Sequence, residues 1–496
     1  MRVTNNMMRS NSVMNMQKNK IAYNKYLQQY NTQKKIQRPS DDPTIAVRAL
    51  KYRTTLAEIE QYLTNIEDAT SWMDATETVL KDVDARLDYM IDYCTQAATG
   101  TVNADDRQNI VSQLKEYADY IYEQDANQDY AGRYLFTGFR TDVALLFEQS
   151  QEHITYTITE ELDINTINKY DFVYGQAEYS EDKTAADYAN EASQFEFTHR
   201  ILVSYNNCDV DGKDVTLTYK DVNGVEKTVT AVTKSVGDDV VFNEHLNPGE
   251  NEVYFVPETG EVLFGEGIYD DVRSGSELSI KYEKTSFAKN DIRPEHYFKC
   301  STVDNETGEE MLYTTAGQQS IKYQINFSQT LAINTESCNS ISTSIGRTVE
   351  DIANICADVD VIEANLVSVE KRIADCDEGD TETMANLKEL KAQIETQLEL
   401  EKTVLTKALS AAITTFQKEK DTINVALADH GSRYARMEMT KSKLEDQQMD
   451  TQEAKSDNED VDLGEAYINF SEADLLYQAT LGATSKILGQ SLLDFI

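Results

Sequence analysis

Few residue patterns in this chain could support catalysis. The five histidines, at positions 153, 199, 245, 296 and 430, form no His-Glu-x-x-His zinc motif, and the sequence has no Gly-x-Ser-x-Gly nucleophile elbow and no phosphate-binding glycine loop followed by lysine. Glu295 and His296 are adjacent and could supply a general base, but a buried structural histidine is the preferred interpretation. We therefore predict that the protein is not an enzyme.

The sequence also gives little indication of metal binding or of disulfide bonds. The segment Asp209-Val210-Asp211-Gly212-Lys213-Asp214 spaces carboxylates as a calcium loop could, but it lacks the remaining ligands of an EF-hand, so an Asp-Gly turn is the preferred interpretation. The six cysteines form no Cys-x-x-Cys pair and no cluster with histidine, which indicates neither a zinc site nor a disulfide framework. We expect no cofactor and no metal.

The charge of the chain limits its partners. Its 496 residues include 46 Lys and Arg against 87 Asp and Glu, a net charge of −41, which argues against a nucleic-acid partner. No run approaches the roughly 20 apolar residues that a membrane-spanning helix needs, so we expect no membrane insertion. Residues 1–40 carry eight basic and no acidic residues, whereas residues 457–496 carry eight acidic residues and one lysine. The two ends could therefore attract each other.

Helical periodicity dominates both ends of the chain. Apolar residues spaced by three and four predict a helix that starts near Val13 and reaches Tyr30. The hexapeptide Arg38-Pro39-Ser40-Asp41-Asp42-Pro43 then breaks the chain, with Asp42 as a candidate N-cap and Pro43 in the first turn of the next helix. That helix, over residues 43–99, would be roughly 85 Å long. A length of this order is typical of a coiled coil or bundle.

The C-terminal part repeats this organisation. Helical stripes return after residue 335, continue past a polar break near Asp377, and are interrupted again by the polar run 456–460 before a last amphipathic segment from 461 to 496. We expect apolar residues of the two long arms to pack against one another: Leu56, Ile59, Leu63, Ile66, Trp72, Met73, Leu80, Leu87, Ile91, Leu427, Tyr434, Met437 and Leu444.

The middle of the chain has a different character. Residues 141–334 are acidic and alternate β-prone segments with turns, and Asn223-Gly224 between two such segments predicts a hairpin. The predicted fold is a multi-domain α+β protein in which long terminal helices pair as a coiled-coil-like bundle around an inserted β-rich outer domain. Its predicted parts are an N-terminal amphipathic helix with link (1–42), a long-helix arm (43–140), the outer domain (141–334), a second arm (335–456) and a C-terminal amphipathic helix (457–496).

This organisation favours a role in assembly. Two terminal arms with apolar stripes must bury them against each other or against neighbouring copies, and the ends could order only on assembly. The residues that we expect at this assembly interface are apolar or aromatic: Met7, Val13, Met16, Tyr23, Leu27, Tyr30, Phe470, Tyr477, Leu481, Ile487, Leu488, Leu492, Leu493 and Phe495.

Several sequence passages resemble the hook–filament junction proteins of the flagellin superfamily. They are Met1-Arg2-Val3-Thr4-Asn5-Asn6-Met7, the link from Arg38 to Pro43, Asn65-Ile66 with Ser71-Trp72, and Ala126-Asn127 with Gly132-Arg133-Tyr134-Leu135-Phe136-Thr137-Gly138. In the C-terminal part they are Asp460-Val461-Asp462-Leu463-Gly464-Glu465-Ala466 and Ser491-Leu492-Leu493-Asp494-Phe495-Ile496. The likeness covers about residues 1–140 and 400–496. One departure is Thr32-Gln33-Lys34-Lys35, where relatives often carry a glycine turn, so the first two helices could be less sharply separated here.

The resemblance implies a structural subunit of the bacterial flagellum at the junction between hook and filament. It implies export by the flagellar type III apparatus without a cleaved signal peptide, and an extracellular location. The implied partners are copies of the chain, the first hook-associated protein on the hook side, flagellin on the filament side, and an export chaperone. Flagellin itself, the filament subunit, is the nearest alternative. A surface adhesin or glycan-binding protein on a helical stalk is a more distant one.

Overall fold

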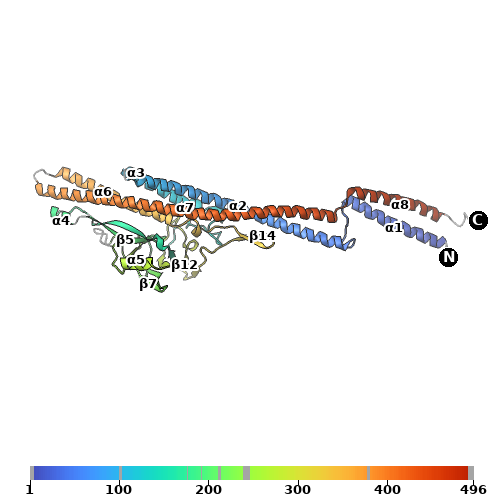
Figure 1. The fold of residues 1–496 in the computed structure, drawn as a ribbon, viewed down its shortest axis with the longest axis horizontal. Coiled ribbons are helices and arrows are strands. Elements are labelled where there is room, and N and C mark those ends of the chain that lie inside the picture. Colours follow the sequence, from blue (N-terminus) through green and yellow to red (C-terminus); the bar gives the residue numbers. More distant parts are fainter. Residues whose placement is uncertain are drawn as a thin grey trace, which may run out of the picture. The chain divides into compact units, whose positions relative to one another are not determined.

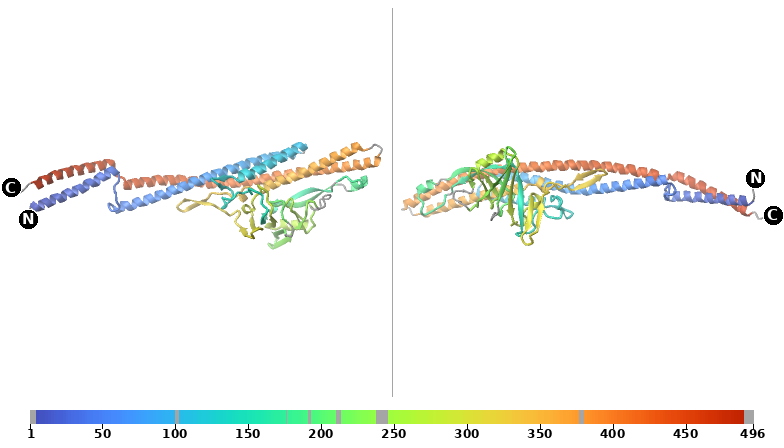
Figure 2. Two further views of the ribbon diagram at one scale, coloured as in Figure 1. Left: turned by 180° about the vertical axis from the view of Figure 1, so that it is seen from behind. Right: turned by 90° about the horizontal axis from the view of Figure 1, so that it is seen from below.

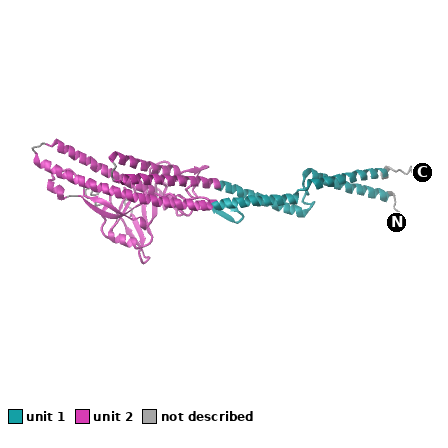
Figure 3. Ribbon diagram, turned by 45° about the horizontal axis from the view of Figure 1, so that its top comes forward, with its two compact units in different colours: residues 1–69, 323–331, 435–496 teal, residues 70–322, 332–434 magenta. Residues whose placement is uncertain are grey.

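The computed structural model describes residues 5–99, 103–175, 177–190, 193–209, 214–237, 246–376 and 380–489. The chain divides into two compact units, shown in different colours in Figure 3. Unit 1 comprises residues 1–69, 323–331 and 435–496, and unit 2 comprises residues 70–322 and 332–434. Both units therefore combine segments from distant parts of the sequence.

Unit 1 is mainly helical. It contains α1 (Asn5–Thr32), α8 (Leu463–Gly489), the beginning of α2 (Pro43–Ala97) and the end of α7 (Thr381–Glu459). Helices α1 and α8 run side by side (Figures 1 and 2). The hairpin of β14 (Lys322–Asn326) and β15 (Gln329–Ala332) contributes residues 323–331 and lies against α2, where Asn65 Nδ2 donates to the carbonyl of Gln324 at 2.9 Å. The ring of Phe327 also contacts Tyr62 edge to face, with 5.2 Å between centroids.

The helices of unit 2 are joined by buried or half-buried ion pairs. They are the remaining parts of α2 and α7 together with α3 (Ala104–Tyr120) and α6 (Ser344–Asp375). Arg107 of α3 contacts Asp360 and Glu363 of α6 at 3.0 and 2.9 Å, and its own side chain is only 8% exposed. Because a buried guanidinium needs anionic partners, these contacts fix how α3 lies on α6.

Two sheets complete unit 2. The six-stranded sheet has the order β13 (Glu310–Tyr313), β12 (Lys299–Asp304), β3 (Ile154–Leu162), β11 (Leu278–Lys284), β6 (Thr216–Lys220) and β7 (Glu226–Thr230). The five-stranded sheet has the order β4 (Asn168–Tyr174), β5 (Gln194–Leu202), β10 (Glu261–Phe264), β9 (Val253–Val256) and β8 (Val232–Thr233). Neighbouring strands are antiparallel except for β8 and β9.

Short elements connect these strands and helices. They are the π-helical turn Ile121–Ala126, the strands β1 (Asp129–Tyr130) and β2 (Arg133–Tyr134), the helices α4 (Ala185–Asn190) and α5 (Glu266–Arg273), and the 3₁₀ turns Ile164–Thr166, Pro294–His296 and Ser337–Asn339. The predicted hairpin at Asn223-Gly224 joins β6 to β7, and Gly224 adopts a left-handed φ of +76°.

The two sheets share one hydrophobic core. Inward-facing residues of both sheets form it, among them Ile158, Leu217, Phe255, Phe264, Ile280 and Tyr282. A second cluster lies where α6 and α7 pack together, with Ile362, Val369, Leu387, Leu390 and Ile394 buried beside Tyr188. The predicted class, a multi-domain α+β protein with paired terminal helices and an inserted β-rich region, is therefore confirmed.

Two sequence expectations need correction. The break predicted over residues 456–460 falls later, because α7 continues to Glu459 and the helix is interrupted only from Asp460 to Asp462. The first two helices are sharply separated, because α1 ends at Thr32, Gln33 adopts a left-handed φ of +58°, and α2 begins only at Pro43. Residues 323–331 belong to unit 1, where their hairpin packs on α2.

Candidate assembly interface

An aromatic ladder joins the two terminal helices. The ring of Tyr23 in α1 packs on Phe470 and Tyr477 of α8, with centroids 5.6 and 5.5 Å apart. The ring of Tyr30 stacks on Phe470 at 5.8 Å and contacts Tyr467 at 6.0 Å. Offset aromatic pairs of this kind contribute about 0.5–1.5 kcal/mol beyond area burial. We call this contact between α1 and α8 the seam.

The seam runs antiparallel. Asn19 lies one turn before Tyr23 in α1, and its Nδ2 donates to Thr480 Oγ1, one turn after Tyr477 in α8, at 3.2 Å. The seam therefore pairs the beginning of α1 with the end of α8. The antiparallel order determines which residues of α1 lie opposite which residues of α8.

The link between α1 and α2 is ordered by two aspartates. Asp41 Oδ2 accepts hydrogen bonds from the backbone N–H groups of Gln37 and Arg38 at 3.1 and 2.9 Å, which lowers the pKa of its carboxyl. Asp42, the expected N-cap, accepts from the N–H groups of Thr44 and Ile45 at 2.9 and 3.2 Å. These bonds satisfy backbone donors that the start of a helix leaves unpaired.

The two breaks in the helices are hydrogen-bonded to each other. The N–H of Lys35 donates to the carbonyl of Glu459 at 2.7 Å, and the N–H of Val461 donates to the carbonyl of Gln33 at 3.0 Å. Residues Lys34 and Asp460 form the antiparallel bridge between these bonds, and their side chains form an ion pair. The link after α1 and the link before α8 are thus held together as one connection.

Glu459 is the electrostatic centre of this connection. Its side chain is 4% exposed and accepts from Arg53 Nε at 3.0 Å and from Arg53 Nη2 at 2.8 Å, while Lys34 Nζ lies 3.5 Å away. The hydrogen bond from Arg53 is the main reason that the pKa of Glu459 is lowered. The expected attraction between a basic N-terminal and an acidic C-terminal segment is therefore present within one chain.

The residues predicted for the assembly interface occupy different positions. Those of the seam face are half-buried: Val13, Met16, Tyr23, Leu27, Phe470 and Tyr477. Met7, Tyr30 and Leu481 are more exposed, at 55%, 37% and 46%. The side chains of Ile487 and Leu488, and residues Leu492, Leu493 and Phe495, lie outside the described residues. Part of the predicted assembly interface is therefore already covered by the seam between α1 and α8 of the same chain.

A second apolar face was missed by sequence reasoning. Met14 and Ile21 of α1 are 47% and 70% exposed, and Ile468 and Leu475 of α8 are 58% and 71% exposed. At 100° per residue, these positions point away from the seam on their respective helices. The signal was present in the sequence as a spacing of seven in Met7, Met14 and Ile21, but it was overshadowed by the three-and-four stripe of the seam.

All of the residues predicted to pack between the arms are buried or half-buried. In unit 1, Ile59, Ile66, Met437 and Leu444 are buried, and Leu56 and Leu63 are half-buried. In unit 2, Trp72, Met73, Leu80 and Leu87 are buried, and Ile91, Leu427 and Tyr434 are half-buried. Lys420 of α7 reaches Asp84 of α2 at 3.7 Å and also pairs with Asp88, which joins the two arms within unit 2.

Glu295, His296 and Asp209 of unit 2, which could have served in catalysis or metal binding, are buried or paired within the fold. His296 is 3% exposed, and burial lowers its pKa to about 4, so it is neutral at physiological pH. The adjacent Glu295 is paired with Arg140 and Arg293 at 3.4 and 3.3 Å. Asp209 is held by a backbone bridge to Glu283, whereas residues 210–213 of the possible calcium loop lie outside the described residues.

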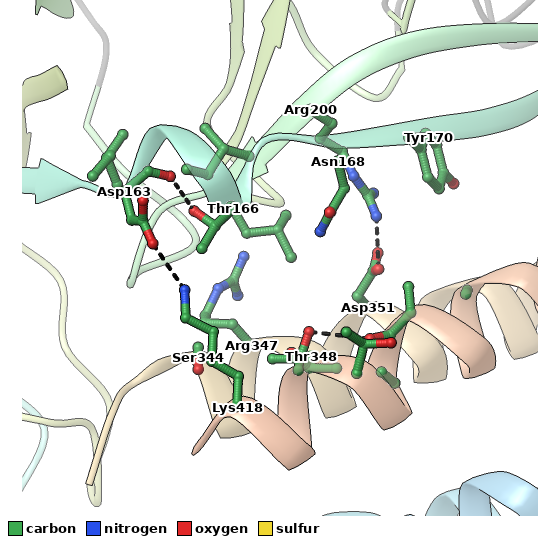
Figure 4. Close-up of a pocket in the computed structure, with 18 of the residues that line it drawn as sticks. Asp163, Thr166, Asn168, Tyr170, Arg200, Ser344, Arg347, Thr348, Asp351 and Lys418 are labelled. Carbon is green, nitrogen blue, oxygen red and sulfur yellow. Dashed lines mark hydrogen bonds and ion pairs between the residues drawn. The ribbon is translucent and has the colours of Figure 1, made fainter. Parts of the chain in front are cut away.

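A cavity of about 520 Å³ lies where β4 and β5 face the helices α6 and α7 (Figure 4). Its charged side chains are paired across it, with Arg200 bound to Asp351 at 2.7 Å and Lys418 to Asp163 at 2.9 Å. Ser344 at the start of α6 donates to Glu419 at 2.7 Å. Because these contacts bridge sheet and helices, the cavity lining holds the two layers of unit 2 together.

Within the described part of the chain, no three His, Cys, Asp or Glu residues gather as metal ligands would. None of the helices seen there is both long and apolar enough to cross a membrane.

Comparison with known families matches both ends of the chain. The bacterial flagellin N-terminal helical region matches residues 3–141, which include α1, α2, α3 and the turn that follows them. The bacterial flagellin C-terminal helical region matches residues 409–496, which include the later part of α7 and all of α8. The matched regions contain the seam and the connection around Glu459.

Curated relatives are distant in sequence. Flagellar hook-associated protein 3 of Escherichia coli (strain K12) is 27% identical over 154 residues, which is 31% of this chain and 49% of that protein. The protein of the same name from Salmonella typhimurium is 28% identical over 144 residues, covering 29% of this chain and 45% of that protein. The chain thus spans about half the length of the curated relatives that it matches.

Solved structures give a weaker likeness. FlgL of Xanthomonas campestris is 12% identical with a TM-score of 0.32, covering 82% of this chain and 99% of that one. The flagellar junction protein FlgL of Legionella pneumophila is 11% identical with a TM-score of 0.27, covering 84% and 100%. The likeness to known families therefore rests on the two helical regions, residues 3–141 and 409–496, that resemble those of bacterial flagellin.

Proposed function

We propose that this protein is a structural subunit of the bacterial flagellum that forms the junction between hook and filament. The observation that carries the proposal is the seam, in which α1 and α8, both within matched flagellin regions, pair and still present exposed apolar residues on their outer faces. Exposed apolar surface of this extent on paired helices favours contact with further copies. The names of the E. coli and Salmonella relatives support the junction over other axial positions.

The proposed partners follow from this position. On the hook side the subunit contacts the first hook-associated protein, on the filament side it contacts flagellin, and within its own layer it contacts copies of itself. An export chaperone holds it before assembly, and the flagellar type III apparatus exports it without cleaving a signal peptide. The proposed location is the extracellular flagellum, and the proposed role is structural and not enzymatic.

Flagellin itself is the second candidate. It is favoured by the family descriptions of the two matched regions, which are those of the flagellin helical regions. The two candidates differ in how far they polymerise, because a junction protein forms a short layer whereas a filament subunit continues to add.

Isolated hooks that carry the first hook-associated protein, incubated with the purified protein, test the proposal. Electron microscopy is expected to show a short added layer at the distal end of each hook that does not lengthen when more protein is supplied. Long filaments of this protein would identify a flagellin instead. No binding to hooks would contradict both roles and would return attention to a surface adhesin.

A further inference from the structure

The outer faces of α1 and α8 carry opposite charge. On α1, Lys18 and Lys25 are exposed on the side that points away from the seam, which is also the side of Met14 and Ile21. Helix α1 contains no acidic residue. The outer face of α1 is therefore apolar and basic.

The outer face of α8 is apolar and acidic. Glu465 and Glu472 are exposed on its side opposite the seam, next to Ile468 and Leu475. These two glutamates, like Lys18 and Lys25, form no ion pair with any residue that the structure describes. The charges on both outer faces thus remain available to another molecule.

We infer that the outer face of α1 in one copy docks on the outer face of α8 in the next copy. This inference rests on the proposed function, because it names the contact by which copies of the subunit associate. Two α1 faces would repel each other, since α1 contains no acidic residue, and two α8 faces would bring together surfaces that each carry two glutamates against the single Lys486. The contact is therefore heterologous, and repeating it builds a ring or a helix of copies.

The spacing of the residues supports one register. Lys18 and Lys25 are seven positions apart, and so are Glu465 and Glu472. In an antiparallel contact, the register that places Lys18 opposite Glu472 therefore also places Lys25 opposite Glu465.

The same register aligns the apolar residues. It brings Met14 within one position of Leu475 and Ile21 within one position of Ile468. Two apolar contacts and two ion pairs thus form together. Within one copy, Tyr23 lies between Phe470 and Tyr477, so this register shifts neighbouring copies by about two helical turns, or ~11 Å.

Charge reversal tests the inference. One variant carries Lys18→Glu and Lys25→Glu, and the other carries Glu465→Lys and Glu472→Lys. Each variant alone places like charges across every contact, and we expect its layer formation on isolated hooks to fall about tenfold or more, scored by electron microscopy and by co-sedimentation with hooks. An equimolar mixture is expected to restore binding, because an alternating order of the two variants makes every contact complementary again.

The controls separate this contact from folding and from general charge effects. Arg48→Glu with Lys51→Glu makes the same change in net charge at exposed positions of α2, away from both outer faces, and this variant is expected to bind hooks as the unchanged protein does. Circular dichroism melting of each variant is expected to match that of the unchanged protein, since the substituted side chains are exposed.

The outcomes distinguish the two proposals. Failure of the unchanged protein to bind hooks would overturn the junction role and this contact with it. Normal binding by both charge-reversed variants would overturn the contact and leave the junction role standing. Loss of binding that the mixture does not restore would also overturn the contact, because the charges would then face a different molecule.

Discussion

Arg53 and Glu459 are 406 positions apart in the sequence and form a two-point ion pair, with Nε and Nη2 of the arginine donating to the two carboxylate oxygens at 3.0 and 2.8 Å. The glutamate is 4% exposed, whereas the arginine is 58% exposed. The pair joins the beginning of α2 to the end of α7, at the point where the chain turns toward α8. It ties together the two regions that the flagellin family models match.

Replacing Glu459 with glutamine is expected to weaken this connection. The neutral side chain loses the charge-assisted bonds to Arg53, and because the arginine is largely exposed we expect a loss of about 1–2 kcal/mol in local stability. Hydrogen exchange of the backbone amides near residues 53 and 459 measures the loss as faster exchange. Glu453→Gln, at an exposed position of the same helix, serves as the matched control. Equal exchange in the two variants would show that the pair contributes nothing.

The pair of Arg53 and Glu459 also predicts that the stability of the folded protein decreases at acid pH. The pKa of Glu459 in the folded protein lies below its ordinary value of 4.5, so the folded state binds its proton less readily than the unfolded state does. The contribution of Glu459 to stability is therefore complete above about pH 4.5 and is lost as the pH falls through the lowered pKa. Glu459→Gln should remove this part of the acid sensitivity. An unchanged acid profile in that variant would contradict the prediction.

Replacing Gln33 with glycine is expected to stabilise the turn after α1. Gln33 holds a φ of +58°, which is unfavourable for a residue with a side chain, and its carbonyl would still accept from Val461 in the variant. After the greater freedom of glycine in the unfolded chain is counted, we expect a gain of about 0.5–1 kcal/mol. Thermal melting followed by circular dichroism measures the change. Gln28→Gly, within α1, should instead lower stability by about 1 kcal/mol, and a similar loss at position 33 would contradict the account.

Glu401 predicts the opposite pH dependence in unit 2. Burial, with a contribution from the charge of Asp358, raises the pKa of Glu401 to about 7. The folded state therefore favours the protonated form, and stability falls as the pH rises from about 4.5 through 7. Glu401→Gln should stabilise the protein at pH 8 by about 1–2 kcal/mol, a value reduced for partial solvent screening, and should have no such effect at pH 4.

Denaturant unfolding at the two pH values, followed by the fluorescence of Trp72, measures this effect within unit 2. Glu399→Gln is the matched control, because Glu399 is two positions away on the same helix and exposed. An identical gain in both variants would mean that the burial of Glu401 is not the cause. Loss of stability at pH 8 in Glu401→Gln would contradict the prediction directly.

Leu481→Asp is expected to leave the monomer folded and to block assembly. Leu481 is 46% exposed on α8, so a charged side chain there costs little in one copy but would be buried without a partner between copies. Thermal melting of the variant should match that of the unchanged protein, while layer formation on hooks should be lost. Leu481→Asn separates the charge from the loss of an apolar contact. Normal incorporation of the aspartate variant would remove Leu481 from the interface.

Much of this arrangement could be predicted from local sequence. The stripes of apolar residues at three and four positions marked α1, α2, α7 and α8, because such spacing places side chains on one helical face. Pro43 and Asp42 marked the beginning of α2, and Asn223-Gly224 marked the turn between β6 and β7. Each of these patterns depends on only a few neighbouring residues, so it can be recognised without knowledge of the rest of the fold.

Other features depend on long-range contacts that one sequence does not specify. The position of β3 between β12 and β11 depends on pairing across more than a hundred residues, which no local pattern indicates. Helix α1 has two apolar stripes, and only the position of α8 decides that Tyr23 faces inward and Ile21 outward. In the local sequence Glu459 belongs to a polar run, and its buried ion pair with Arg53 exists only once the arms have folded together.

The most direct test of the central claim is filament growth on isolated hooks. Hooks that carry the first hook-associated protein are supplied with flagellin, with and without prior incubation with this protein, and filament lengths are measured by electron microscopy. The junction role predicts that filaments grow only on hooks that first received this protein, from a short layer of constant length. Equal filament growth on hooks that never received it would contradict that role.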